Sequence, residues 1–333
     1  RVRPFLHARF VAPVVERGRL AAVVIEDKSG RRAIRARYFV DATGDGDLVA
    51  RLGLSCRKLA DLQPPTTAAV FRGLKSCSCR NPHFSLGKAV FDPKTPGSLP
   101  PGFLWDAEII GAPDCRLVAG TRVSRADCSD ADELTRAEME GRRQVRAMLD
   151  LLHAHVPGGK AVTLTNLPAH IGVRETRHVN GLYRLTEKDV LSGRRFPDAI
   201  GNGSYRVDVH HSGKPGITFR YLSGREVYIE ANGTCREGRW RPKMAIDPVY
   251  YQIPYRSLVP KGPLASNVLV AGRLMDADRG AYGAVRVIVN CNQTGEAAGT
   301  AAFLALDATL PVAKVDAKKL RAQLAASGAA VME

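Results

Sequence analysis

The most constraining feature of this sequence is a hydrophobic run that ends in small and acidic residues, Phe39-Val-Asp-Ala-Thr-Gly-Asp-Gly-Asp47. Leu48, Val49 and Leu52 follow at helical spacing up to Gly53, so the segment predicts a strand, a tight turn and a short helix. Glycine in such a turn lets another molecule approach the backbone, and open α/β sheets bind ligands at the carboxyl ends of their strands. An ordinary strand-to-helix turn explains the same residues, so this segment alone leaves both interpretations open.

The residues before this segment alternate between β-rich runs and turn signals. Phe10–Val15, Leu20–Glu26 and Ala33–Val40 are rich in strand-forming residues, and Arg17-Gly18 and Lys28-Ser29-Gly30 separate them. Runs of this kind separated by glycine-containing turns are typical of antiparallel hairpins. The sequence therefore predicts a three-stranded meander whose last strand runs directly into the residues Asp41–Asp47.

The middle of the chain is less regular. Proline and glycine interrupt the residues from Leu54 to Thr121, which favours short antiparallel strands. Thr135 and Glu138 form a capping-box pattern ahead of apolar residues at helical spacing, so we expect a helix from about Arg136 to His155. Further strands are expected near residues 161–165, 205–210, 217–219 and 227–229.

A second segment with chemical potential lies near the end. Asn267–Ala271 reads as a buried strand, and a helix rich in small residues is expected to open at Thr294-Gly295 and to run to Leu306. The free N–H groups at a helix start stabilise negative charge, which a reduced flavin carries. Close packing of a small-residue helix explains the same composition. An amphipathic helix is expected at Lys314–Ala326.

Composition excludes several classes of protein. The chain has 333 residues, of which 45% are hydrophobic, enough for a sizeable core, and no apolar stretch is long enough to span a membrane. The formal net charge is +16, but the arginines occur in ones and twos without a basic run. Nucleic-acid-binding proteins gather their charge on one face. We therefore expect no nucleic-acid partner and interpret the charge as a solvated, arginine-rich surface.

The cysteines and histidines give no metal signature. Seven cysteines are present, Cys77-Ser-Cys79 lacks a second ligand pair, and His153 and His155 point to different helix faces. We expect reduced thiols, which fits a cytoplasmic location, and no metal site. The chain begins with an arginine instead of methionine, so we also expect it to be a fragment whose targeting signal, if any, lies elsewhere.

Several segments in order resemble one family. These are the Phe39–Asp47 segment, Tyr251-Gln-Ile-Pro-Tyr-Arg-Ser-Leu-Val259, Val270-Ala-Gly-Arg273 and Thr294-Gly-Glu-Ala-Ala-Gly299. Together they resemble the FAD-dependent oxidoreductases of the two-dinucleotide-binding, glutathione-reductase-like fold. Ile171-Gly-Val-Arg-Glu-Thr-Arg177, with the residues that follow it, is similar to the FAD_oxidored branch of that group.

The resemblance implies a mixed α/β fold with FAD as cofactor. A Rossmann-like FAD/NAD(P)-binding domain would comprise residues 1–60 and 251–310, an inserted, mainly antiparallel β substrate domain residues 61–250, and a C-terminal helix residues 311–333. No G-x-G-x-x-G phosphate loop occurs before residue 41, so the FAD-binding domain is expected to be incomplete at its N-terminus. Arg273 also stands where related proteins commonly have an acid.

The resemblance also assigns cofactor contacts residue by residue. Val11 would flank the adenine, and four residues after the first strand would pass near the ribose and pyrophosphate. Six residues near the second strand would surround the ribityl chain and the ring edge. The full set is Val11, Ala42, Thr43, Gly44, Asp45, Gly272, Arg273, Asp276, Thr294, Gly295 and Ala297.

A polar cluster in the middle of the chain is the candidate for substrate chemistry. Arginines would clamp an anion or hydroxyls of a small-molecule substrate, and a histidine would accept a proton while a hydride passes to flavin N5. The candidates are Arg174, Arg177, His210, His211 and Arg256. An interdomain salt-bridge network explains them equally, and Arg286 either lies beside the flavin or forms a salt bridge. A flavin-free remnant acting as a binding or scaffolding module is the alternative function.

Overall fold

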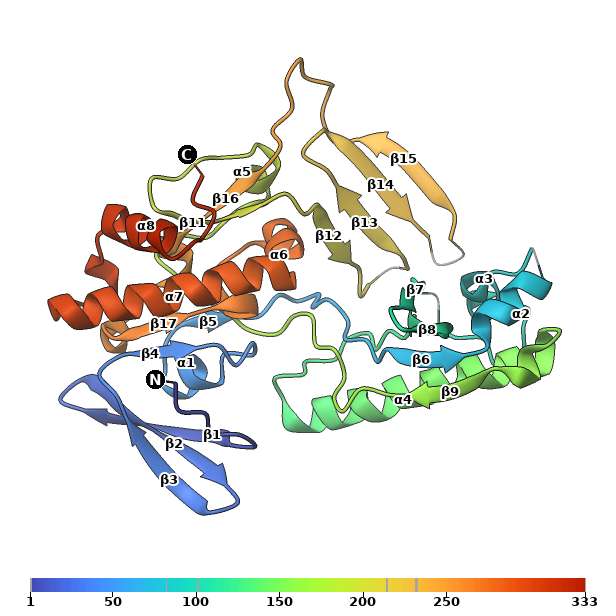
Figure 1. The fold of residues 1–333 in the computed structure, drawn as a ribbon, viewed down its shortest axis with the longest axis horizontal. Helices are drawn as coiled ribbons and strands as arrows, with labels where there is room; N and C mark the ends of the chain where they lie inside the picture. Colours follow the sequence, from blue (N-terminus) through green and yellow to red (C-terminus); the bar gives the residue numbers. More distant parts are fainter. Residues whose placement is uncertain (1, 82, 101, 214, 231–232, 333) are drawn as a thin grey trace.

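The computed structural model describes residues 2–81, 83–100, 102–213, 215–230 and 233–332. The fold is mixed α/β, with one parallel strand pair and several antiparallel sheets (Figure 1). Within the described residues, no helix is both long enough and apolar enough to cross a bilayer.

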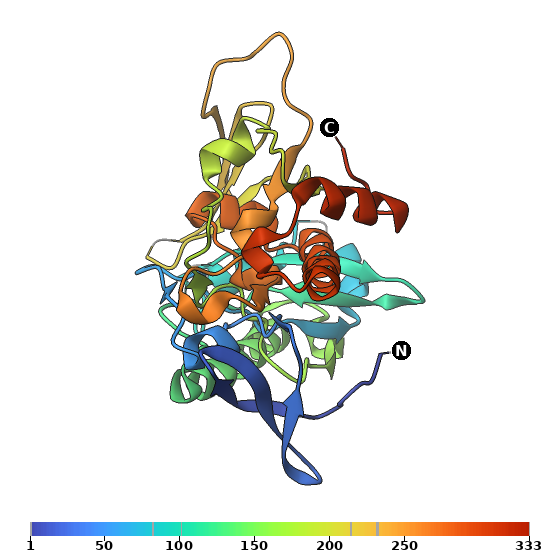
Figure 2. The same ribbon diagram turned by 90° about the vertical axis from the view of Figure 1, so that its left-hand side faces the viewer.

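The chain begins with the expected antiparallel meander of β1 (Arg9–Glu16), β2 (Arg19–Asp27) and β3 (Gly30–Arg35). Its two turns place Gly18 and Gly30 at positive φ, which glycine adopts without steric strain. In Figures 1 and 2 the meander projects from the rest of the molecule, at the bottom of both views.

The strand expected over Ala33–Val40 is wrong, because the chain divides there into two strands in different sheets. β4 (Phe39–Asp41) leaves the meander and pairs in parallel with β17 (Val268–Val270). The Asn267 side chain donates a hydrogen bond of 2.8 Å to the carbonyl of Arg37, and so fixes the chain where it passes between the sheets. The predicted strand near Asn267 is confirmed.

A four-stranded antiparallel sheet, in the order β7-β8-β6-β9, packs with helices in the region on the right of Figure 1. The irregular antiparallel character expected there is confirmed, but two short helices, α2 and α3, were not predicted. This region consists of β6 (Ala69–Arg72), α2 (Leu74–Arg80), α3 (Leu86–Phe91), β7 (Trp105–Ile109), β8 (Ala112–Ala119), α4 (Ala131–His155), η1 (Gly159–Ala161) and β9 (Thr163–Asn166).

Helix α4 ends where predicted but begins earlier. Its N-cap is Asp130, whose carboxylate accepts from the backbone N–H groups of Asp132 and Glu133. Thr135 is not the cap, because its hydroxyl donates to the carbonyl of Ala131 within the helix. The capping-box pattern was therefore misplaced, since an aspartate five residues earlier satisfies the first N–H groups of the helix.

A second antiparallel sheet, in the order β12-β13-β14-β15, lies at the upper right of Figure 1 and contains the strands expected near residues 205–229. It consists of β12 (Val207–His210), β13 (Ile217–Arg220), β14 (Arg225–Ile229) and β15 (Cys235–Arg239). The remaining elements are α1 (Asp47–Arg51), β5 (Cys56–Arg57), β10 (His178–Val179), α5 (Glu187–Leu191), β11 (Ala199–Gly203), β16 (Tyr251–Pro254), η2 (Tyr255–Leu258), η3 (Pro263–Ala265), η4 (Gly272–Leu274), α6 (Arg279–Val285), α7 (Ile288–Ala308), η5 (Val312–Lys314) and α8 (Ala317–Ala326).

Helix α7 begins at Ile288, so the predicted opening at Thr294-Gly295 is wrong. The backbone N–H groups of Asn290 and Cys291 already donate to the carbonyl of Val287. A threonine followed by glycine imitates a helix start, but here the threonine hydroxyl bonds inside the helix, to the carbonyl of Cys291 at 2.8 Å.

Two main hydrophobic cores organise the molecule. The larger core joins buried residues from three separate parts of the chain, between residues 20 and 54, 179 and 209, and 251 and 324. The smaller core contains buried residues between 69 and 162. The parallel pair β4–β17 belongs to the larger core, and α7 packs against both strands.

Candidate functional site

The carboxyl ends of the two parallel strands lie level with each other. Asp41 at the end of β4 pairs with Val270 at the end of β17, and the N–H of Ala271 donates to the carbonyl of Asp41 at 3.0 Å. The loops that follow the two strands therefore leave the sheet side by side. Ligands of open α/β sheets bind outside such strand ends.

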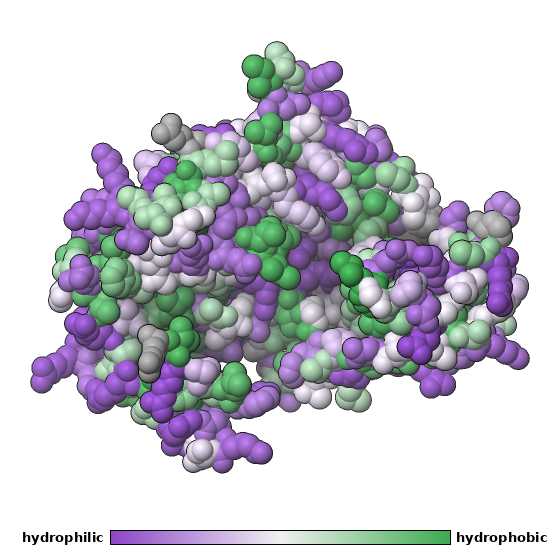
Figure 3. All heavy atoms as spheres, in the orientation of Figure 1, coloured by the Kyte–Doolittle hydropathy of each residue, from purple (hydrophilic) through white to green (hydrophobic). Residues whose placement is uncertain are grey.

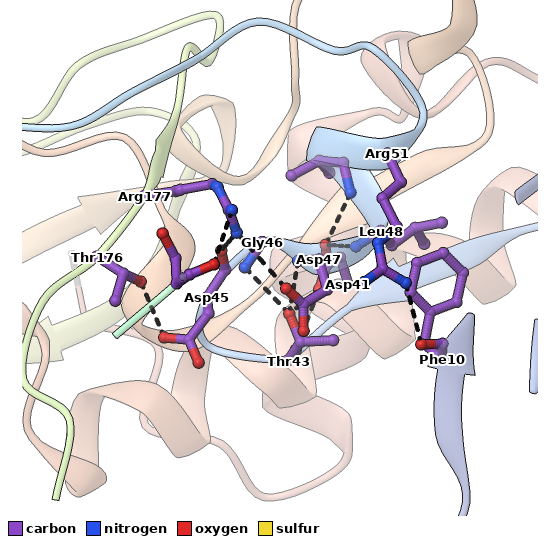
Figure 4. A network of polar contacts seen from close by, with 12 residues as sticks. Phe10, Asp41, Thr43, Asp45, Gly46, Asp47, Leu48, Arg51, Thr176 and Arg177 are labelled. Carbon is purple, nitrogen blue, oxygen red and sulfur yellow. Dashed lines mark hydrogen bonds and ion pairs between the residues drawn. The ribbon is translucent and has the colours of Figure 1, made fainter. Parts of the chain in front are cut away.

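Asp41 and Thr43 hold the first of these loops in shape (Figure 4). One carboxylate oxygen of Asp41 accepts from the N–H and hydroxyl of Thr43, and the other accepts from the N–H groups of Leu48 and Val49. The Thr43 hydroxyl also accepts from the N–H groups of Gly46 and Asp47. Asp41 thus caps α1, and the Thr43 side chain stabilises the loop between β4 and α1.

An acid–arginine pair joins the two loops. Both terminal nitrogens of Arg273 lie 3.3 Å from an Asp45 carboxylate oxygen, which also accepts from the Thr176 hydroxyl at 2.8 Å. Gly44 has a positive φ of 82°, and a Cβ there would lie 2.4 Å from Nη2 of Arg273. The positive φ therefore favours glycine at position 44, and a side chain there would displace the end of Arg273.

Arg177 lies against the same loop (Figure 4). Its guanidinium donates to the carbonyls of Asp45 at 2.9 Å and of Ser129 at 3.1 Å, and it lies 3.5 Å from the carboxylate of Asp47. Burial and the charge of Asp45 raise the pKa of Asp47, and the charge of Arg177 opposes this increase. The structure therefore places Arg177 with the predicted cofactor residues.

The second loop is tied to helix α7. Gly272, at φ 71°, donates its N–H to the Thr294 hydroxyl at 2.9 Å, and Ala297 is fully buried one turn further along the helix. Gly295 lies on the exposed side of α7, where an added Cβ would meet no atom within 4 Å. These residues share a helix but not a face.

Asp276 is occupied by protein groups. Its carboxylate lies 2.7 Å from Arg57 and 3.1 Å from Arg184, and it accepts from the N–H of Gly181 at 2.8 Å. Burial lowers the pKa of Arg57, although the charge of Asp276 opposes this shift. The structure thus assigns Asp276 to an internal ion-pair cluster. Val11, on β1, presents its carbonyl to Arg51 at 2.6 Å.

A second polar cluster contains Arg174 and His210. Arg174 donates through Nη1 to the carbonyl of Pro64 and the hydroxyl of Thr66. The imidazole of His210 has Nδ1 3.3 Å from Nη2 of Arg122 and Nε2 3.3 Å from the carboxylate of Asp208. Because an arginine nitrogen is always a donor, Nδ1 must accept, which leaves the proton on Nε2.

His210 is strongly biased towards its neutral form. Burial lowers its pKa well below the ordinary value, and the charges of Arg174, Arg286 and Arg122 lower it further. The adjacent His211 is partly buried, and its Nε2 lies 2.8 Å from the hydroxyl of Thr218.

Arg286 extends the same cluster from the end of α6. Its guanidinium is 12% exposed and lies 3.6 Å from Asp208. The structure therefore pairs Arg286 with Asp208. A Cβ at Gly283 would lie 2.5 Å from the carbonyl oxygen of Asp208, so glycine there allows α6 to approach β12 closely.

Arg256 lies in a third place. It forms an ion pair of 2.9 Å with Asp198 and stacks over the ring of Tyr183 at 5.1 Å. The five predicted substrate residues are therefore divided between the loop after β4, the cluster around Asp208 and the Arg256–Asp198 pair. Among the described residues, no group of three or more potential ligands is placed to hold a metal ion.

The model of one family, described as FAD dependent oxidoreductase, matches residues 1–324. The chain belongs to this family. The description of this family names FAD as the cofactor and oxidation and reduction as the class of chemistry. No curated protein matched the sequence.

Several solved flavoenzymes are similar to the chain. A triple mutant of the flavin-dependent brominase Bmp2 is 11% identical with a TM-score of 0.37, over 94% of this chain and 53% of that one. The myxobacterial chondrochloren halogenase CndH is 12% identical with a TM-score of 0.34, over 95% and 50%. Aklavinone-11 hydroxylase, solved with FAD and aklavinone, is 11% identical with a TM-score of 0.28, over 89% and 36%. The present chain thus spans about half the length of the brominase and of the halogenase.

The residues at the two strand ends fit an extended cofactor. Ala42 and Thr43 are exposed immediately after β4, and Gly44 and Gly272 have positive φ values that keep bulky side chains out of both loops. The space beside Gly295 is open as well. Small residues with accessible backbone are what a dinucleotide requires where it crosses strand ends.

Two residues of the candidate site, Asp41 and Arg122, were not predicted from the sequence. Asp41 was part of the quoted motif, and an acid at a strand end followed by threonine is a usable signal for a loop-capping carboxylate. Arg122 follows an irregular segment without any motif. Only the fold brings it to His210, so no local signal could have found it.

Proposed function

We propose that this chain binds FAD across the carboxyl ends of β4 and β17 and transfers a hydride between a small polar organic substrate and flavin N5. The observation that carries the proposal is the level pairing of these strand ends, with small residues in both following loops, in a chain that belongs to an FAD-dependent family. FAD supplies an acceptor for two electrons and a proton when bound.

The cofactor residues fall into three groups in this proposal. Ala42, Gly44 and Gly272 would let FAD approach the backbone, while Gly295 and the adjoining turn of α7 would leave room for the ring system. The side chains of Thr43, Asp45, Arg273, Asp276 and Thr294 already bind protein groups, so we expect them to shape the site. Val11 and Ala297 would support it from β1 and from inside α7.

The substrate side of the proposal rests on the cluster around Asp208. Arg174 would orient the substrate, and His211 is the better of the two histidines for accepting a proton, because arginines surround His210. Arg177 would position the loop after β4, and Arg256 would stabilise the turn after β16 through Asp198.

FAD binding is tested by spectroscopy on the 333-residue chain and, in parallel, on the protein isolated from its natural source. We expect the isolated protein to be yellow and the chain alone to bind FAD more weakly, because its first 40 residues contain no G-x-G-x-x-G loop. Gly295→Leu should fold and lose flavin, since its side chain enters open space where we place the ring. Gly238→Leu, at an equally open position on β15, is the control.

The outcomes separate two functions. Retention of flavin by Gly295→Leu at normal stoichiometry would show that the ring lies elsewhere. A colourless natural protein that folds and binds no added FAD would favour the flavin-free binding module.

A further inference from the structure

The cluster around Asp208 carries more positive than negative charge in its interior. Arg122, Arg174 and Arg286 surround a neutral His210, and Asp208 is the carboxylate that contacts this group. Arg122 is 8% exposed, and the Arg286 and Asp208 side chains are 12% and 10% exposed. Three cations against one anion leave a surplus of two positive charges in a nearly dry environment. Such charges are costly unless a partner neutralises them.

The donors of this cluster are incompletely used. Within the part of the chain that the structure describes, Nε and Nη2 of Arg286 and Nε2 of Gln63 are buried without a hydrogen-bond partner. Gln63 belongs to the cluster because its Oε1 accepts from the N–H of His210 at 3.2 Å. Buried donors are almost always satisfied in folded proteins, so these donors are available to an incoming acceptor.

The arginines also show the effect of this surplus on one another. Burial lowers the pKa of Arg174 to about 9, and the charges of Arg286 and Arg122 contribute to this shift. Burial likewise lowers the pKa of Arg122 to about 10. Both groups remain charged near neutral pH, and an incoming anion would relieve the repulsion between them.

The surroundings suggest the class of anion. Phe103 packs edge-on against His210 at 6.3 Å and against Phe219 at 6.4 Å, so an aromatic wall adjoins the charged groups. This wall favours an anion that carries an apolar body, as an organic carboxylate does and inorganic phosphate does not. Figure 3 shows hydrophilic and hydrophobic residues side by side on this face of the molecule.

We infer that Arg122, Arg174 and Arg286 form a carboxylate-binding subsite, so that the substrate of the proposed oxidoreductase is an organic acid. The substrate role rests on the proposed function, whereas the anion site follows from the cluster itself. A guanidinium fork binds a carboxylate through two parallel hydrogen bonds, and its planar shape suits that group.

Binding is measured by calorimetry and thermal unfolding with sodium acetate, sodium benzoate and inorganic phosphate at constant ionic strength, using the protein with its flavin. We expect the carboxylates to bind more tightly than phosphate, and benzoate more tightly than acetate. Arg122→Met and Arg174→Met should each weaken carboxylate binding by about tenfold or more, as expected for a lost charge-assisted hydrogen bond. Arg146→Met, at a 74% exposed side chain on α4, is the matched control and should bind like wild type.

Asp208→Asn gives a change in the opposite direction. Removing the carboxylate increases the surplus positive charge, so carboxylates should bind more tightly to this variant. A purely structural ion-pair network would instead lose stability without any gain in anion affinity. This variant decides the question if the arginine variants fail to fold.

Four results would overturn the carboxylate subsite. The first is that folded wild-type protein binds no carboxylate, and the second is that it binds phosphate more tightly than carboxylates. The third is that Arg122→Met and Arg174→Met both bind carboxylates as tightly as wild type. The fourth is that Asp208→Asn binds carboxylates no more tightly than wild type. The flavin absorbance separates this failure from that of the proposed function. Carboxylate binding by a natural protein that never holds FAD would support the anion site and contradict the oxidoreductase.

Discussion

At the scale of single residues, His210 shows how tertiary contacts set chemistry. A histidine at the end of a strand is a candidate base from sequence, because its ordinary pKa lies near neutral pH. In the structure it is 6% exposed, and its imidazole faces Arg122 and Asp208, with Arg174, Arg286 and His211 also lowering its pKa. Its charge state is therefore decided by groups far away in the sequence.

This environment predicts a pH-dependent stability. Because the pKa of His210 is lowered on folding, the unfolded chain takes up a proton below about pH 6.5 that the folded chain does not. Its contribution is therefore complete above that pH and decreases as pH falls, by up to about 1.4 kcal/mol per pH unit. Urea unfolding between about pH 7.5 and pH 5.5 measures it. His210→Gln should show a smaller pH dependence than wild type, whereas His170→Gln, at an 84% exposed side chain, should not differ from wild type. Equal slopes in all three proteins would contradict the assignment.

At the scale of secondary-structure elements, the spacing of apolar residues predicted the elements correctly more often than the capping patterns predicted where helices begin. The meander and the end of α4 at His155 are confirmed, because strand alternation and helical spacing are local properties. The starts of α4 and α7 were wrong by several residues. Threonine at positions 135 and 294 resembles an N-cap, but each hydroxyl bonds inside a helix that has already begun.

For two helical glycines we predict opposite effects of alanine substitution on the free energy of unfolding. A Cβ at Gly283 in α6 would lie 2.5 Å from the carbonyl oxygen of Asp208, so Gly283→Ala should lower the free energy of unfolding by about 1 to 3 kcal/mol. Gly295 in α7 faces open space, so Gly295→Ala should raise it by about 0.8 to 1 kcal/mol through helix propensity. Denaturant unfolding of the two variants measures both. Loss of stability in both would show that the outer face of α7 is packed against something.

At the scale of the whole molecule, the net charge of +16 is distributed rather than gathered. Exposed arginines pair with nearby carboxylates in separate places. Arg143 pairs with Glu140 within α4, and Arg31 on β3 pairs with Glu26 on β2. Such pairing neutralises the surface locally. A basic groove of the kind that binds nucleic acid requires adjoining unpaired cations.

We therefore predict only weak association with nucleic acid. Fluorescence anisotropy with a labelled DNA of about 20 nucleotides should show binding at about 50 mM salt that is lost at about 200 mM. The same DNA in a random sequence should behave identically, because no base contacts are expected. Tight binding that persists at the higher salt concentration would contradict this prediction.

The sequence by itself determined the local elements and the family. The Phe39–Asp47 segment specifies a strand, a turn and a helix through residues that touch one another, and ordered motifs along residues 1–324 mark an FAD-dependent oxidoreductase. Only the tertiary structure decided that Arg177 holds the loop after β4 and that Asp276 binds arginines. It also gathered Arg122 with His210, which lie 88 positions apart. Contacts between distant residues depend on how sheets and helices pack, and a pattern of neighbouring side chains carries no record of that packing.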